Sequence, residues 1–256
     1  MILHVVERGN GPPLALLHGL FGSARNFGTV QRELARTFRV LALDLRNHGD
    51  SPHADGMSYR AMAEDVLETL RARDALPCAL VGHSMGGKAA MVLALQAPEA
   101  ASRLVVVDIA PVPYGHGRMA YAEAMASVPL TPGLTRITAD AALAGAVPDP
   151  AVRGFLLQNL RFGAAPEWRL GLKQIIAALP DIEGWPAPSA RPYAKPTLFV
   201  AGARSDYIRP EHRPTIRLLF PAARFLTLKD AGHWVHADNP AAFVAVLETF
   251  FFSLSP

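Results

Sequence analysis

The sequence predicts an α/β fold in which helices cover both sides of a mostly parallel, doubly wound sheet, and three observations support this prediction. The chain has 256 residues, of which 50% are hydrophobic and 18% are charged, so one large domain with a deep core is expected. Short strand patterns alternate with helical patterns along the chain. Several strand patterns are apolar on both faces, as in strands that helices cover on both sides.

Seven short runs rich in Val, Leu, Ile and Phe are predicted as strands. They are residues 2–7, 13–18, 38–45, 78–83, 103–110, 197–202 and 224–228. Between the third and fourth runs, residues 58–75 show a helical pattern with Ser58 in a position to cap the first turn. Residues 240–254 are predicted to close the chain with another helix.

The segment from residue 112 to residue 195 breaks this alternation. It has no convincing strand, and its helical patterns are separated by runs rich in proline and glycine. We therefore interpret residues 112–195 as a helical lid inserted into a core formed by residues 1–111 and 196–256.

Composition restricts the class of partner. The formal net charge is only +3 and the arginines are scattered, so we expect a small-molecule substrate and neither nucleic acid, membrane nor an obligate protein partner. The single cysteine, Cys78, lies in an apolar run, which suits a reducing compartment. Residues 1–11 lack a signal-peptide pattern and no apolar run reaches bilayer length, so a cytoplasmic protein is expected.

Residues 82–86 read Gly-His-Ser-Met-Gly and match the pattern G-x-S-x-G between a predicted strand and a predicted helix. The glycines allow a sharp turn that holds Ser84 in a strained backbone conformation. The helix that follows directs its N-terminal amides toward a group bound beside the serine hydroxyl. The pattern predicts that Ser84 is a nucleophile, the alternative being an ordinary strand-to-helix turn.

A serine hydroxyl needs a base that a third group holds in place. His233 is the predicted base because it follows the last strand and a tight turn at Gly232, and His236 is the second choice. In the chain order of this arrangement, the acid lies between the serine and the histidine. Asp108 ends one strand and Asp206 follows another, and the spacing does not decide between them.

An acyl-transfer site also needs backbone donors for the oxyanion. We expect the Met85 amide to be one donor and the Leu20 amide, in the loop of residues 16–23, to be the other, with Phe21 as the alternative. The pocket is expected to be apolar, with few polar anchors. Its candidate lining residues, each of which is equally expected to pack in the lid core, are Phe21, Met85, Ile109, Phe155, Leu156, Leu160, Trp168, Trp185 and Trp234.

Two further features are given structural interpretations. Arg46, Asn47 and His48 are expected to brace the site through hydrogen bonds to the backbone. Lys88, in the helix after the serine turn, is expected to be exposed or ion-paired and not catalytic.

Taken together, these motifs resemble the YbfF-like carboxylesterases of the α/β-hydrolase superfamily, nearly from end to end. The resemblance is carried by HGLFGS (18–23), DLRNHGDSP (44–52), GHSMGGK (82–88), VVDIAPV (106–112), EWR (167–169) and AGHWVHAD (231–238). It implies an α/β-hydrolase fold with a lid inserted after the sixth strand. It also implies Ser84 as nucleophile, His233 as base and Asp108 as acid.

The resemblance matches Ser205 to a serine that assists the catalytic network, and the adjacent Asp206 keeps the alternative acid open. The expected activity is that of a serine esterase that cleaves short- to medium-chain acyl esters, with acyl thioesters as further candidates. The alternatives are perhydrolysis or carbon–carbon bond hydrolysis on the same residues, or a receptor that binds a ligand without cleaving it. We expect no metal and no organic cofactor, since no metal-ligand spacing is present.

Overall fold

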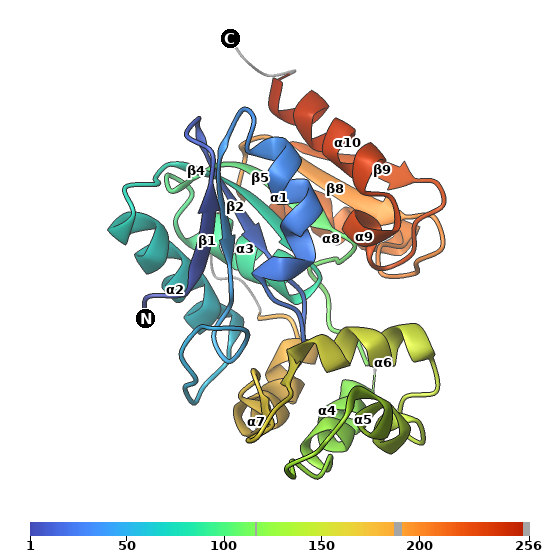
Figure 1. Ribbon diagram of the computed structural model, residues 1–256. Helices are drawn as coiled ribbons and strands as arrows, with labels where there is room; N and C mark the ends of the chain where they lie inside the picture. The colour runs from blue at the N-terminus through green and yellow to red at the C-terminus, as the bar shows by residue number, and fades with distance from the viewer. Residues whose placement is uncertain (116, 187–190, 253–256) are drawn as a thin grey trace.

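A seven-stranded sheet forms the centre of the computed structural model, which describes residues 1–115, 117–186 and 191–252 (Figure 1). In sheet order the strands are β1 (Val5–Arg8), β3 (Arg39–Leu43), β2 (Pro13–Leu17), β4 (Cys78–His83), β5 (Ala101–Val107), β8 (Thr197–Gly202) and β9 (Ala223–Leu228). β1 pairs antiparallel with β3, and the other neighbouring pairs are parallel. The predicted fold class is confirmed, with each of the seven predicted strands present.

Helices cover both faces of this sheet because its side chains alternate between two buried clusters. Leu14 and Leu16 of β2 belong to one cluster, and Ala15 and Leu17 belong to the other. The first cluster is covered by α1 (Gly28–Leu34), α9 (Val235–Asp238) and α10 (Pro240–Phe252), and the second by α2 (Tyr59–Ala72), α3 (Met85–Gln96) and α8 (Arg213–Leu219). Two short 3-10 helices, η1 (Ala24–Phe27) and η3 (Pro210–His212), complete this part of the chain.

The predicted helix at residues 58–75 corresponds to α2. The Ser58 side chain accepts a hydrogen bond from the Ala61 amide at 3.2 Å, so it caps the first turn as expected. The final predicted helix corresponds to α10, and residues 253–254 of that prediction lie outside the described residues.

The chain between β5 and β8 leaves the sheet, and we call its described residues from 112 to 195 the insertion. It contains α4 (Arg118–Ala126), α5 (Arg136–Leu143), α6 (Pro150–Leu156), η2 (Leu157–Asn159), β6 (Leu160–Arg161), β7 (Glu167–Trp168) and α7 (Leu172–Glu183). Its helices lie below the sheet in Figure 1. The antiparallel pair β6–β7 is a correction to the expectation of no strand here, since two residues per strand leave no visible alternation in the sequence.

The position of the insertion also corrects the strand count that came with the resemblance. Five strands of this chain, β1 to β5, precede it, not six.

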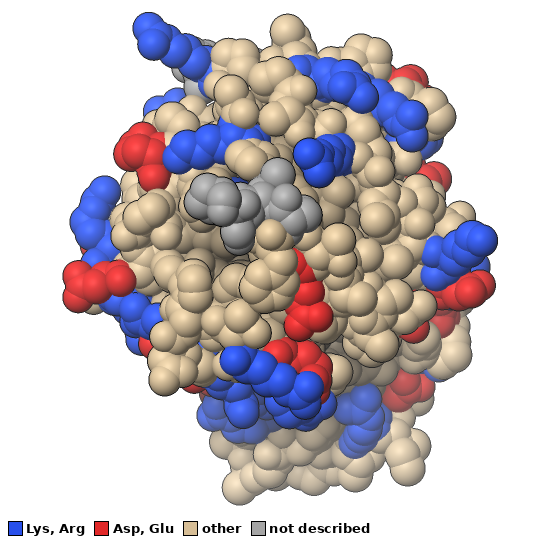
Figure 2. Space-filling model, turned by 90° about the horizontal axis from the view of Figure 1, so that it is seen from above, with Lys and Arg blue, Asp and Glu red and all other residues tan. Residues whose placement is uncertain are grey.

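On the face shown in Figure 2, Lys and Arg side chains are interspersed with Asp and Glu side chains and form no continuous basic strip. Among the helices within the described ranges, none combines the length and the apolar character needed to cross a bilayer.

Candidate active site

Ser84 stands on a strained turn between β4 and α3. Its φ of 52° lies in the left-handed region, which a residue other than glycine adopts only when its surroundings hold it there. The neighbouring glycines make the turn possible: a Cβ atom on Gly82 would lie 2.3 Å from the Gly86 carbonyl oxygen, and one on Gly86 would lie 2.4 Å from the Leu17 oxygen. The predicted turn is therefore present, with the serine at its tip.

His233 and Asp108 meet Ser84 from two other strand ends. His233 follows β9, and its Nε2 lies 3.2 Å from Ser84 Oγ. Asp108 follows β5, is fully buried, and its Oδ2 lies 2.8 Å from His233 Nδ1. Asp206, the alternative acid, is exposed to solvent. With Nδ1 donating to the carboxylate, Nε2 of a neutral His233 is the ring nitrogen that accepts the serine proton.

The Asp108 carboxylate is held by two further donors. The Gly202 amide donates to Oδ1 at 3.1 Å, and the Ser205 hydroxyl donates to Oδ2. The pKa of Asp108 is raised to about 7, chiefly by burial and to a smaller extent by the nearby Asp206 charge, while the Ser205 and Gly202 hydrogen bonds oppose this rise. Ser205 thus lies where the resemblance implies a helper.

A second histidine supports the loop that carries His233. His83 Nε2 donates to the His233 carbonyl oxygen at 2.8 Å, and burial keeps the pKa of His83 well below its usual value. His236, the second choice for the base, packs its ring 4.6 Å from the Phe27 ring, with Nδ1 buried. Burial also keeps the pKa of His236 well below its usual value, so it is neutral.

Met85 and Leu20, whose amides are the predicted oxyanion donors, line the same cavity as Ser84. The Met85 amide opens α3, and the first amides of a helix have no intrahelical acceptor. A Cβ atom on Gly19 would lie 3.2 Å from Ser84 Cβ, so the loop of residues 18–22 approaches the nucleophile closely.

His18 orients the peptide between Gly19 and Leu20. Its Nδ1 donates to the Gly19 carbonyl oxygen at 2.8 Å, and because C=O and N–H of a trans peptide point in opposite directions, the Leu20 amide faces away from His18. The Phe21 amide instead donates to His48 Nε2 at 3.1 Å, which argues against Phe21 as the alternative donor.

The residues of the 44–52 loop make the structural contacts expected of them. Arg46 forms an ion pair with Asp65, and the side-chain Nδ2 of Asn47 donates to the Ala54 carbonyl oxygen. Burial lowers the pKa of His48 to about 3, so this histidine is neutral and can accept from Phe21.

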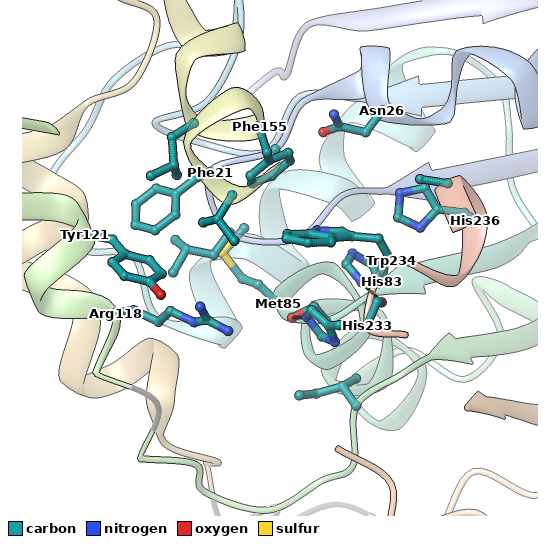
Figure 3. Close-up of a pocket in the computed structure, with 18 of the residues that line it drawn as sticks. Phe21, Asn26, His83, Met85, Arg118, Tyr121, Phe155, His233, Trp234 and His236 are labelled. Carbon is teal, nitrogen blue, oxygen red and sulfur yellow. Dashed lines mark hydrogen bonds between the residues drawn. The ribbon is translucent and has the colours of Figure 1, made fainter. Parts of the chain in front are cut away.

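A cavity of about 580 Å³ opens at Ser84, between the sheet and the insertion. Figure 3 shows Met85 near its middle, with Arg118 and Tyr121 on one side and His233 and Trp234 on the other. The predicted lining residues that do line it are Phe21, Met85, Ile109, Phe155, Leu156 and Trp234.

Three predicted lining residues, Leu160, Trp168 and Trp185, are not among those that form this cavity. Trp168 sits in β7, where it pairs with Leu160 of β6, so both are committed to packing within the insertion. The cavity is also less apolar than predicted, because Arg25, Arg118 and Arg136 reach it.

Sequence reasoning missed Tyr207, which lies against the base, and Arg118, which contacts Tyr207. The Tyr207 ring stacks on the His233 ring at 4.0 Å, and its hydroxyl accepts a hydrogen bond from the Arg118 guanidinium at 2.7 Å. Tyr207 follows Asp206 in a loop already singled out, so its position could have been a signal. Arg118 lies in the insertion, where nothing in the sequence marks it.

The expectation that Lys88 is exposed or ion-paired is wrong. The residue is 1% exposed, and no carboxylate oxygen of the described residues lies within 4 Å of its Nζ.

The chain is similar over most of its length to one known family and to several known proteins. Residues 12–240 match the family described as the alpha/beta hydrolase fold. The chain is 43% identical to the mouse sn-1-specific diacylglycerol lipase ABHD11, covering 93% of this chain and 80% of the mouse protein. It is 36% identical to esterase YbfF of Escherichia coli, covering 94% of this chain and 93% of that protein. A solved marine microorganism esterase superposes with a TM-score of 0.94 at 34% identity, covering 98% of this chain and 99% of that one.

Proposed function

We propose a mechanism for this chain from one premise: it belongs to the α/β-hydrolase fold family and is a carboxylic ester hydrolase. Ser84, His233 and Asp108 form its catalytic triad. The observation that carries this proposal is the unbroken line of contacts from Ser84 Oγ to His233 at 3.2 Å and from His233 to Asp108 at 2.8 Å. The substrates are short- to medium-chain acyl esters and acyl thioesters.

The first half of the reaction forms an acyl-enzyme. His233 Nε2 takes the Ser84 proton as Oγ attacks the carbonyl carbon, and Asp108 stabilises the imidazolium that results. The Met85 and Leu20 amides hold the oxyanion, and one such donor contributes about 3 kcal/mol to transition-state stabilisation. His233 then returns its proton to the leaving alcohol or thiol.

In the second half, His233 removes a proton from water, and the resulting hydroxide attacks the acyl carbon. The same two amides hold the second oxyanion. As this intermediate collapses, His233 gives its proton to Ser84 Oγ, which releases the acid and restores the Ser84 hydroxyl. Each step uses side chains and amides of the chain alone.

The cavity supports an acyl substrate. Phe155 and Trp234 pack their rings 5.4 Å apart, which joins the insertion to the loop of the base, and both line the space beside Ser84. Apolar walls of this kind favour an acyl chain over a small charged group.

An acyl-length series of matched oxygen esters and thioesters tests the substrate class. Each methylene that becomes buried contributes about 0.8 kcal/mol, so kcat/KM is expected to rise about fourfold per carbon and to stop rising when the cavity is full. Both series are expected to be turned over and to peak at the same acyl length, because one cavity receives both. Ser84→Ala protein provides the blank.

Three results would contradict this assignment. Faster turnover of β-diketones than of any ester would favour carbon–carbon bond hydrolysis, and peroxide-dependent formation of peracid would favour perhydrolysis. Saturable binding without any turnover would favour a receptor.

Ser205→Ala is expected to move the acid limb of the kcat/KM profile to higher pH. The Ser205 hydroxyl stabilises the ionised Asp108 carboxylate, so its removal raises the pKa of Asp108 above about 7 and leaves less of the active anion at neutral pH. The rate is expected to approach that of the unaltered protein at alkaline pH.

Asp206→Asn is a control that is expected to shift the pH profile in the opposite direction. Loss of its charge lowers the pKa of Asp108, so the acid limb is expected to move to lower pH. A uniform drop in rate at every pH in Ser205→Ala would instead indicate a merely structural hydroxyl.

A further inference from the structure

The buried lysine on the helix that follows the nucleophile has no role in the mechanism above. Lys88 lies one turn after Ser84 in α3, and its amide donates to the Ser84 carbonyl at 3.1 Å. Its side chain is almost fully buried, without a carboxylate of the described residues in ion-pair range. A lysine is rarely placed so deep without a partner, so the groups around its Nζ must take the place of an acid.

Those groups are the last carbonyls of α7 and two aromatic rings. Nζ donates to the Gly184 oxygen at 2.5 Å and to the Glu183 oxygen at 3.4 Å. It lies 4.9 Å from the centre of the Tyr114 ring and 5.4 Å from that of Tyr59. The end of a helix carries partial negative charge and unpaired carbonyls, and ring faces attract cations.

The Tyr59 hydroxyl completes this helix cap from α2. It donates to the Ile182 oxygen at 2.5 Å. Two residues of the hydrolase core, Lys88 and Tyr59, therefore satisfy three consecutive carbonyls where α7 ends.

The same place is where both connections of the insertion meet. The Tyr114 amide, on the way into the insertion, donates to the Glu183 oxygen at 2.8 Å, on the way out of it. The Arg118 amide donates to Glu183 Oε1 at 3.3 Å, and the Arg118 side chain then reaches Tyr207, whose ring stacks on His233. The cavity is lined by Tyr114, Arg118, Ile182 and Glu183, and also by Lys88 and Tyr59 themselves.

From this geometry we infer that Lys88 is a positioning residue. It holds both connections of the insertion against α3, the helix that follows the nucleophile, and thereby fixes the position of the cavity wall formed by Ile182 and Glu183. The inference rests on the proposed function only for its kinetic consequence. Lysine supplies a long stem and several N–H donors, which a methionine of similar length lacks.

Lys88→Met tests the inference by two measurements. Hydrogen exchange in peptides covering residues 117–126 and 172–186 is expected to become about tenfold faster, while peptides covering β4 and β5 stay unchanged. KM for the best acyl ester is expected to rise about tenfold with a smaller change in kcat, since ester binding depends on the wall whereas Ser84, His233 and Asp108 are held by strand ends.

Lys173→Met is the matched control. Lys173 is exposed in the first turn of the same helix α7, so its removal is expected to leave both exchange and kinetics unchanged. Tyr59→Phe removes only the hydroxyl on the Ile182 carbonyl and is expected to give the same exchange pattern at smaller size. It decides the question if Lys88→Met fails to fold.

Unchanged exchange at both connections in Lys88→Met and Tyr59→Phe would overturn the inference. A fall in kcat alone, with KM and exchange unaltered, would also overturn it and would place Lys88 in the chemistry. If the unaltered protein cleaves no ester, the proposed function fails, but the exchange measurement still stands as a test of the Lys88 contacts.

Discussion

Ser84→Ala is expected to abolish ester hydrolysis, with kcat lowered on the order of 10⁶-fold. The reason is that Ser84 Oγ is the atom that bonds to the acyl carbon, and the neighbouring backbone donors cannot replace it. Initial rates on the best ester of the acyl series, measured against the uncatalysed reaction, give the loss. The variant is expected to fold. Alanine at a φ of 52° carries the same backbone strain as Ser84, and the flanking glycines that permit the turn are unchanged.

Covalent labelling gives an independent measure of the same residue. A fluorophosphonate probe is expected to add its mass to a peptide that contains Ser84 in the unaltered protein and to none in Ser84→Ala. Ser205→Ala serves as the control and is expected to be labelled still. Labelling or turnover that survives in Ser84→Ala would remove this serine from the mechanism.

Asp108→Asn is expected to lower kcat about 10⁴-fold, because an asparagine cannot hold His233 in the tautomer that accepts the serine proton. The Asp108 carboxylate is buried and lies 2.8 Å from His233 Nδ1, whereas Asp206 is exposed. Steady-state rates of both Asn variants on one aryl ester, at the alkaline end of the profile, make the comparison.

Asp206→Asn is expected to stay within about tenfold of the unaltered protein under those conditions, since its charge acts on Asp108 only from a distance. The reverse order, with Asp206→Asn inactive and Asp108→Asn active, would assign the acid to Asp206. Two active variants would mean that the triad itself is misassigned.

Much of the fold could be predicted because local patterns and the global architecture agree. The seven predicted strands appear within a few residues of their predicted ends, since buried parallel strands leave continuous apolar runs. Turn chemistry predicted the serine turn, because only glycine tolerates the close approaches at residues 82 and 86.

The errors fall where distant parts of the chain meet. Lys88 is predicted from the sequence to be exposed or ion-paired. Its partners are a carbonyl group and aromatic rings of residues distant in the sequence, which no local pattern indicates. Trp168 reads as a lining residue by its type, but pairing between β6 and β7 commits it to the insertion. Tyr207 stacks on His233, and Arg118 of the insertion contacts Tyr207, although the two residues lie far apart in the sequence.

The sequence by itself determined the order of strands and helices, the tight turn that carries Ser84, and the position of His233 after the last strand. All three depend on residues close together in the chain, where backbone geometry and side-chain spacing are decisive. Only the tertiary structure decided which carboxylate lies against His233, that the Phe21 amide bonds to His48, and what surrounds Lys88. Those outcomes depend on strand ends brought together by the parallel sheet and on the crossing of two connections, and neither leaves a periodic signal in the sequence.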